Sequence, residues 1–389
     1  MIDRPFDPEA GILKSRAFVS SELYAAELAS IFRRCWLLVA PVSWVQDRGE
    51  YVTTSLGEVP VIVWRGGDGE LRVFLNQCTG GQGPIVTNER GVADTLSCAC
   101  HGWSYSAHES PDALSLIRVP RVEAFSGFVF ACQDVNVPPL SEWMGDFVWY
   151  WDLISGLFCG GVEVVGGGSL RTRVACNWKL AAEAYSGDVY SDGTLSRATR
   201  EVLDLGGALD GRRGLQIATR SGAIAVLLDD DGSSGREDPI EHMAPILATL
   251  FPNISFDGRG RALHVWHPRG VSETEVQTYC LVGKANSMES KAKWRRRCQS
   301  LFGAAGLLMQ DQRAVWESIS SQAKARNSFD LNLQMGLGRE RQFNIPGRCS
   351  DLTSEMNQRA FYEWWQDQLM VSAPPALGAS IKMSRWHAR

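Results

Sequence analysis

The sequence lacks the features that would place it in a membrane, secretory or nucleic-acid-binding class. No stretch reaches the roughly 18 consecutive apolar residues of a membrane-spanning helix. The first residues, MIDRPFDPEAG, lack the charged-then-apolar order of a secretory signal. Its 39 basic and 44 acidic residues give a formal net charge of -5 and form no basic stripe. These absences favour a cytoplasmic protein that binds neither nucleic acid nor membrane.

Histidine is scarce, and the cysteines form no dense framework. The chain has 6 histidines in 389 residues, and none falls between positions 177 and 200. Its 10 cysteines are scattered from Cys35 to Cys349, so we expect reduced thiols, most of them packed in the core. The length and the 44% hydrophobic content are sufficient for a substantial core and favour two domains over one.

The order of the predicted elements indicates an α+β protein. Residues 21–35 open with a serine cap and have apolar side chains at helical spacing. Residues 39–158 predict a small all-β domain that ends in a Trp-rich helical stretch, with strands at 51–56, 59–64, 71–75, 95–98, 103–105 and 127–132. After a glycine-rich joint, longer strands mix with helices, with strands at 223–228 and 264–267 and helices near 177–190, 287–302 and 353–372.

Two loops of the all-β domain carry cysteine and histidine. The first reads CTG at 78–80, and the second reads CACHGW at 98–103. Thiols and an imidazole on two loops indicate a metal site. The pattern resembles the Rieske motif C-x-H…C-x-x-H-G-W of the large (α) subunit of aromatic ring-hydroxylating oxygenases.

The resemblance assigns roles to the residues of these two loops. In that family two thiolates hold one iron of a [2Fe-2S] cluster, and two imidazoles hold the other. Cys78, Cys98 and His101 stand at ligand positions, whereas Gly80 stands where the family has its first histidine. Because glycine has no side chain to bind iron, we expect a degenerate cluster site. Cys100 is disfavoured as a substitute ligand because it lies between neighbouring ligand positions and its side chain would point away.

Two other interpretations of these cysteines and the histidine involve no iron-sulfur cluster. These side chains can serve as packing residues, or they can bind zinc, which accepts thiolate and imidazole ligands.

A second run resembles the iron-binding segment of the same family, N-W-K…E…G-D-x-Y-H-x4-H. Residues 177–196 contain NWK, then a glutamate, then GDVYSDGTLS. In the family the two histidines and a distant carboxylate bind mononuclear ferrous iron. Here Ser191 and Ser196 stand at both histidine positions. The distant carboxylate is expected after FGAAG at 302–306, where the match falls on Gln312, or on Asp311 if the alignment shifts by one residue.

We therefore expect Asp188, Tyr190, Ser191, Ser196 and Gln312 to mark a catalytic-type site whose ligands have been replaced. On this reading the chain has no cofactor, and mononuclear iron is absent. Asp188, which in the family bridges the Rieske centre of one subunit to the iron of its neighbour, is retained. A carboxylate that accepts hydrogen bonds at a subunit contact would explain it equally well.

The resemblance covers nearly the whole chain, since FPNI at 251–254, WHPRG at 266–270 and MGLG at 335–338 also match family landmarks in order. It implies a Rieske-like all-β domain at 39–158 inserted into a helix-grip domain of the START or Bet v 1 kind. That second domain, with an antiparallel sheet and helices, would comprise the N-terminal helical part at 1–38 and the catalytic-type part at 159–389.

The leading functional hypothesis is a catalytically silent α-like subunit, a structural or regulatory partner of a competent α subunit. The expected assembly is a homotrimer, or a hetero-oligomer with competent α and β subunits. One alternative is metal-independent acid–base chemistry, or binding of a hydrophobic aromatic or polycyclic ligand, in the vacated pocket. The other is the active ring-hydroxylating dioxygenase that the overall resemblance implies.

Overall fold

The computed structural model describes residues 4–81, 83–107, 116–165, 168–187, 195–203, 214–229, 243–325 and 330–371. These residues separate into two compact units, a larger one with residues up to 31 and from 138 to 371, and a smaller one with residues 32–137. The Trp-rich stretch before residue 158 belongs to the larger unit, although the sequence placed it in the all-β domain. Its helix α3 (Phe147–Gly156) buries Phe147, Tyr150, Trp151 and Ile154 and contacts strand β16 (Met243–Leu250).

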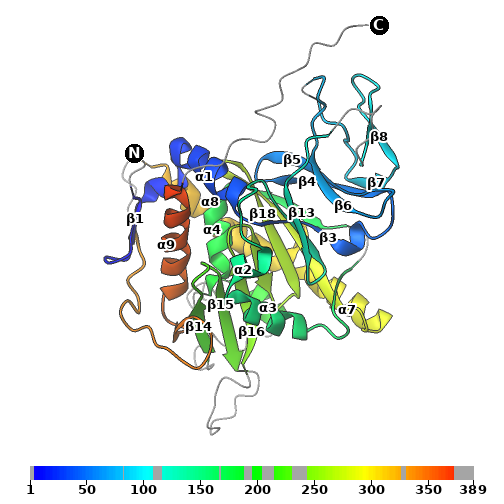
Figure 1. Cartoon of the computed structure of the whole chain (residues 1–389). Helices are drawn as coiled ribbons and strands as arrows, with labels where there is room; N and C mark the ends of the chain where they lie inside the picture. The colour runs from blue at the N-terminus through cyan, green and yellow to red at the C-terminus, as the bar shows by residue number, and fades with distance from the viewer. Residues whose placement is uncertain are drawn as a thin grey trace. The chain divides into compact units, whose positions relative to one another are not determined.

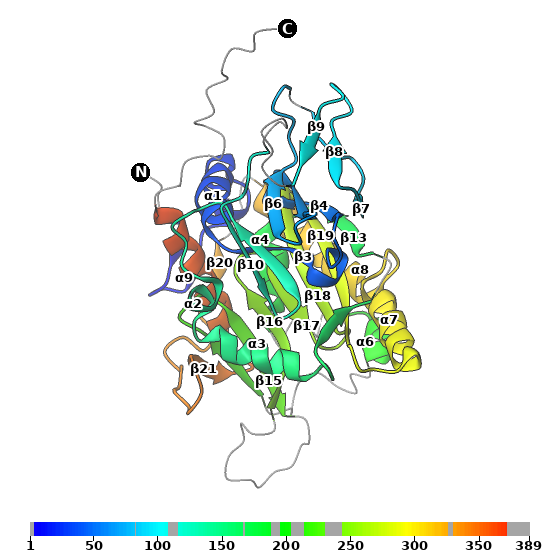
Figure 2. The ribbon, with the colours of Figure 1, turned by 45° about the vertical axis from the view of Figure 1, so that its right-hand side comes forward.

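The smaller unit is built from antiparallel strands, as predicted. Its four-stranded sheet has the order β6-β5-β4-β7, with β4 at Glu50–Leu56, β5 at Val59–Arg65, β6 at Leu71–Leu75 and β7 at Arg90–Val92. A three-stranded sheet pairs β10 (Arg121–Phe125), β11 (Phe128–Cys132) and β3 (Leu37–Pro41). Strands β8 (Thr95–Ser97) and β9 (Ser104–Ser106) form a separate hairpin, visible in Figure 2.

A buried cluster of aromatic and apolar side chains fills this unit, and Cys78 and Cys98 are part of it. Trp64 at its centre is fully buried, and its indole nitrogen donates a hydrogen bond of 3.0 Å to the carbonyl of Ala93. The bases of both predicted metal loops are therefore anchored in a packed core.

The larger unit contains a sheet of nine described strands, all paired antiparallel. Its order is β12-β19-β18-β17-β16-β15-β14-β21, and β13 also pairs with β19. The remaining bounds are β12 Val162–Val164, β13 Leu170–Val174, β14 Gly214–Ala218, β15 Ile224–Asp229, β17 Ile254–Asp257, β18 Ala262–Gly270, β19 Glu273–Gly283 and β21 Arg348–Asp351. A small separate sheet pairs β1 (Phe6–Asp7), β2 (Ile12–Leu13) and β20 (Leu331–Asn332).

Helices pack on this sheet (Figure 1). Helix α9 (Met356–Met370) contacts β14 and β15, α4 (Trp178–Glu183) contacts β18, and α7 (Met288–Phe302) contacts β19. The other helices are α1 (Ser21–Arg34), α2 (Leu140–Met144), α6 (Arg197–Leu203) and α8 (Leu307–Ala323), with short 3-10 turns η1 at Ser15–Phe18, η2 at Val42–Trp44 and η3 at Ala184–Ser186. The predicted α+β class, with an antiparallel sheet and helices beside the all-β domain, is confirmed. No helix among these residues is long and apolar enough to cross a membrane.

A buried ion pair joins three helices of the larger unit. Lys179 of α4 donates to the carboxylate of Glu27 on α1, and neither side chain is exposed to solvent. The same carboxylate accepts hydrogen bonds from the indole nitrogens of Trp178, at 2.7 Å, and of Trp365 on α9, at 2.9 Å. Three charge-assisted contacts thus compensate for the cost of burying the two charges.

Candidate metal centre and catalytic-domain site

The structure brings Cys78, Cys98 and His101 together at the end of the smaller unit. The Sγ atom of Cys78 lies 3.4 Å from Nδ1 of His101, and the Sγ atom of Cys98 lies 3.6 Å from the same nitrogen. The three possible ligand atoms all lie within 4.8 Å of one another. Two loops far apart in the sequence therefore present one group of metal-binding donors.

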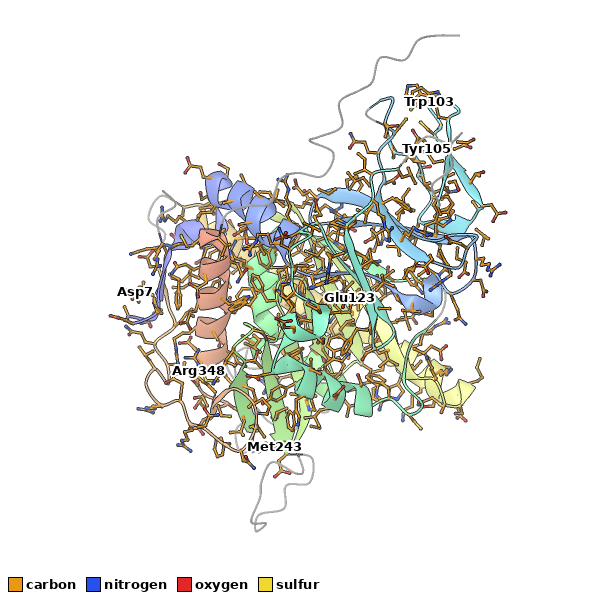
Figure 3. The ribbon with its side chains drawn as sticks, viewed as in Figure 1. Asp7, Trp103, Tyr105, Glu123, Met243 and Arg348 are labelled. Atoms are coloured by element: carbon orange, nitrogen blue, oxygen red, sulfur yellow. The ribbon has the colours of Figure 1, made fainter. Side chains whose placement is uncertain are left out.

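Hairpin geometry positions the second loop. The amide of Cys98 donates to the carbonyl of Trp103 at 2.9 Å, and the amide of Gly102 donates to the carbonyl of Cys98 at 2.8 Å. Gly102 has a φ of +68°, a left-handed conformation that costs glycine little. The turn between β8 and β9 thus aims His101 toward the two thiols. Figure 3 labels Trp103, near the tip of this hairpin, and Tyr105, which follows it on β9.

Hydrogen bonds tune the thiol of Cys78. Its Sγ atom lies 3.1 Å from the hydroxyl of the buried Tyr105. Desolvation raises the pKa of Cys78, but hydrogen bonds from Tyr105, the Gly80 amide, Cys98 and His101 outweigh it and lower the pKa to about 7. The neighbours of Cys78 within the protein therefore favour the thiolate form of this side chain.

The indole of Trp103 occupies the space beside Gly80. A Cβ atom on Gly80 would lie 1.8 Å from Cζ3 and 2.0 Å from Cη2 of that ring. The Trp103 ring also lies against His101, with ring centroids 5.0 Å apart and the ring planes tilted by 31°. The position where the sequence predicted a missing ligand is therefore filled by a neighbouring side chain. Cys100 is exposed and does not join the ligand group, as the sequence indicated.

In the larger unit, only part of the predicted catalytic-type site falls on described residues. Asp188, Tyr190 and Ser191 lie outside them, whereas Ser196 and Gln312 lie within. Ser196 directly precedes α6, and Gln312 belongs to α8. The structure thus describes the surroundings of two of the five predicted positions.

Asp311 joins the start of α6 to α8. Its Oδ2 atom accepts hydrogen bonds from the amide of Ser196, at 2.8 Å, and from the hydroxyl of Thr199, at 2.6 Å. The Ser196 hydroxyl in turn accepts from the amide of Thr199 at 3.3 Å, as a helix N-cap does. The carboxylate that a shifted alignment would make an iron ligand therefore binds the first turn of a helix.

Gln312 contacts a buried tyrosine that the sequence analysis did not single out. The hydroxyl of Tyr185, on η3, donates to Oε1 of Gln312 at 3.2 Å. Burial, together with the charge of Asp257, raises the pKa of Tyr185 well above its ordinary value, so the phenol stays protonated. A stable phenol donor fixes the amide oxygen of Gln312 as its acceptor.

Further polar residues that the sequence left without a role line the sheet near Tyr185. The ring of His264 on β18 lies 4.9 Å from the Tyr185 ring, and its Nδ1 atom lies 2.8 Å from the hydroxyl of Thr278. Burial lowers the pKa of His264 to about 4. Asp257 on β17 is fully buried and forms an ion pair of 2.6 Å with Arg259. In the sequence, His264 and Asp257 stand next to apolar residues of their strands. That pattern did not distinguish these two polar residues from ordinary core positions.

Comparison with known proteins identifies both units. Residues 35–124 match the Rieske [2Fe-2S] domain family, and residues 223–370 match the catalytic domain of the ring hydroxylating alpha subunit. The benzene 1,2-dioxygenase subunit alpha of Pseudomonas putida is 30% identical over 94% of this chain and 92% of its own length. This chain belongs to the ring-hydroxylating oxygenase alpha-subunit family.

Other members of this alpha-subunit family are similar over most of the chain. The biphenyl dioxygenase subunit alpha of Paraburkholderia xenovorans is 28% identical, with coverage of 95% of this chain and 92% of that protein. A solved structure of naphthalene 1,2-dioxygenase with indole bound superposes with a TM-score of 0.83 at 27% identity and covers 96% of this chain and 95% of its own. The fold predicted from the resemblance is thus confirmed.

The expectation that this alpha subunit has no cofactor is wrong. Residues 35–124 match the Rieske [2Fe-2S] domain family, the relatives are named as dioxygenase alpha subunits, and Cys78, Cys98 and His101 stand together as a metal-binding group. The physical reason lies in the immediate surroundings of the three donors. The hairpin, the core around both cysteines and the hydroxyl of Tyr105 hold these donors in place, so replacing one imidazole by Gly80 does not disperse the others.

The two sites differ in how well they fit the family's metals. The three donors of the smaller unit fit a metal with thiolate and imidazole ligands. In the described part of the larger unit, the hydroxyl of Ser196 and the amide of Gln312 do not fit a set of two histidines and one carboxylate. No step of ring hydroxylation follows from these two side chains.

Proposed function

We propose that this chain is an α-type subunit that does not itself hydroxylate aromatic rings and works as a structural or regulatory partner of a competent α subunit. The hydrogen bond from Tyr185 to Gln312 carries the proposal. It holds a neutral amide at the position to which the resemblance assigns the family's carboxylate ligand. The neighbouring carboxylate of Asp311 supports the same reading because it binds Ser196 and Thr199.

The relatives support a role in assembly. They match this chain over nearly its full length. Those relatives are named as alpha subunits, that is, as parts of larger oxygenases. We therefore propose a homotrimer, or a hetero-oligomer with competent α and β subunits. A hydrophobic aromatic compound, of the kind that the relatives' names specify, is the proposed ligand class for the larger unit.

Co-expression with a competent oxygenase tests this proposal. The tagged chain is produced with the β subunit, ferredoxin and reductase of a naphthalene dioxygenase system, with or without the untagged competent α subunit. Conversion of naphthalene, benzene and biphenyl is then measured, and the untagged subunit is sought in the affinity-purified fraction. We expect co-purification of the competent subunit, and product only when that subunit is present.

Two results would overturn the proposal. One is product from the tagged chain without the competent subunit, above the level of a host that lacks both. The other is a tagged chain that remains apart from the competent subunit while its own fold, followed by circular dichroism, is intact. The competent α subunit carrying the same tag is the matched control for both measurements.

A further inference from the structure

We propose that Cys78, Cys98 and His101 hold a single metal ion, with zinc the ion that these donors favour, in place of a two-iron cluster. The inference concerns the smaller unit alone. It goes beyond the proposed function, and it holds whether or not the larger unit hydroxylates aromatic rings.

The distances between the donors fit one tetrahedral ion. Zinc binds thiolate sulfur at about 2.3 Å and imidazole nitrogen at about 2.0–2.1 Å, so two such ligands at the tetrahedral angle lie about 3.5–3.6 Å apart. The two sulfur-to-nitrogen distances here are 3.4 and 3.6 Å. Both thiols therefore stand at the correct separation from His101 to share one ion with it.

The same distances disagree with a cluster. A Rieske centre places its thiolates on one iron and its imidazoles on the other, which puts sulfur and imidazole nitrogen roughly 5 Å or more apart. All three donor atoms lie closer together than 4.8 Å. They surround one point instead of flanking two.

The chain also fills the space beside Gly80, where the family's other imidazole side chain would begin. The indole of Trp103 lies where a side chain on Gly80 would begin. On the next residue, Gly81, a Cβ atom would lie 2.7 Å from Cε1 of His101, so the backbone of the first loop approaches the imidazole closely. An indole and a backbone segment thus pack against the histidine side of the group.

Solvent supplies the fourth position. His101 is exposed, and Cys100, the nearest additional thiol in sequence, does not belong to the group. Two thiolates, one imidazole and a water molecule form a recognised zinc coordination. Thiolate ligands with imidazole favour zinc over the hard cations. The ion would join the loop after β6 to the β8–β9 hairpin.

Metal analysis of the full-length protein tests the inference without any activity measurement. The chain is purified from cells grown without added metal, and zinc, iron and acid-labile sulfide are measured per chain. We expect zinc close to one per chain and negligible labile sulfide. Iron and labile sulfide at two per chain, with the visible spectrum of a cluster, would overturn the inference.

Variants assign the metal to these ligands. Cys98→Ser should weaken zinc affinity by roughly 100-fold or more, since even changes around a ligand cost 10–100-fold. Cys100→Ser is the matched control on the same hairpin and should retain zinc. Equal zinc binding by the two variants would contradict the assignment.

Cobalt loading of the unaltered protein remains informative if Cys98→Ser fails to fold. Cobalt(II) in the proposed site should give thiolate-to-cobalt charge-transfer absorption of the strength expected for two sulfur ligands. A cobalt complex without that absorption would exclude the site.

Discussion

At the scale of single residues, Gly80 and Trp103 decide the character of the smaller unit's site. Sequence matching identified Cys78, Cys98 and His101, because their spacing along two loops is specific to one ligand pattern. It also assigned Gly80 to the position of the family's other imidazole ligand, which stays a prediction. It did not indicate that Trp103 fills the space, since the direction of an indole depends on packing between two loops.

Adding a side chain at position 80 should displace Trp103. In Gly80→Ala the new methyl group would overlap the indole, so the ring must rotate toward solvent and lose its contact with His101. We expect red-shifted tryptophan emission and a loss of roughly 1–3 kcal/mol in the free energy of unfolding, the usual cost of overpacking. Gly67→Ala is the control, because nothing lies within 4 Å of its added Cβ. Identical emission from the two variants would show that Trp103 does not occupy this space.

Two buried histidines should make stability depend on pH. Burial lowers the pKa of both His264 and His267 to about 4, from an ordinary value of 6.5. The unfolded chain takes up these protons near pH 6.5, and the folded chain does so only near pH 4. Their stabilising contribution is therefore complete above pH 6.5 and is lost as the pH falls to about 4.

At about 1.36 kcal/mol for each pH unit, each histidine contributes on the order of 3 kcal/mol to this loss. Urea unfolding between pH 4 and pH 7 measures it. The variant His264→Gln should flatten the dependence of the unfolding free energy on pH over this range. An unchanged slope in that variant would show that His264 takes up its proton at an ordinary pH in the folded protein.

At the scale of elements, hydrophobic periodicity and capping residues were the signals that predicted helices. Helix α7 begins after Ser287, whose side chain accepts from the amide of Ser290, and it matches the helix predicted near 287–302. Of the helix predicted near 177–190, the described part forms α4 and turn η3, and Gly187, with a φ of +83°, follows η3. Residues 188–190 lie outside the described residues. Helix α8 was not predicted, because the residues after FGAAG were read only as a ligand pattern.

The buried Glu27 network should make three helices unfold together. Replacing Glu27 by Gln leaves the ammonium of Lys179 buried without its charged partner. Removing one member of a buried pair costs roughly 3–5 kcal/mol, and we expect a loss of that size in the free energy of unfolding. Chemical denaturation followed by tryptophan fluorescence measures it, since the network includes Trp178 and Trp365.

Arg197→Ala provides the control for this variant. It removes a helical ion pair with Glu201 that is largely exposed to solvent. Exposed pairs of this kind contribute little to stability, so unfolding should be unchanged. If Glu27→Gln were no more destabilising than Arg197→Ala, the network would not hold the three helices together.

At the scale of the whole molecule, the resemblance predicted the architecture because the landmark segments are spread along the entire chain. The resemblance led to the wrong expectation for the cofactor. Counting the ligand positions that match the family motif tells only whether the family's own site is complete, not whether the matched residues still form a metal-binding group. The three remaining donors are held by a hairpin, a packed core and Tyr105, so they form a metal-binding group that the family pattern does not describe. The domain boundary expected at residue 158 differs because helix α3 packs on the large sheet.

Zinc in the smaller unit would strengthen the proposed role of the larger one. Zinc has no accessible redox change, so a chain that holds it would not relay electrons through its Rieske-like unit. At the two described positions of the predicted catalytic-type site, the amide of Gln312 and the hydroxyl of Ser196 stand where the resemblance expects a carboxylate and an imidazole. Either difference, zinc in the smaller unit or replaced iron ligands in the larger unit, would by itself prevent electrons from passing through the Rieske-like unit to an oxygen-activating iron of the same chain. If the smaller unit instead held an iron-sulfur cluster while Gln312 replaced the carboxylate of the larger unit, the subunit would relay electrons without hydroxylating. Metal content and partner-dependent turnover together distinguish this subunit from a zinc-binding one.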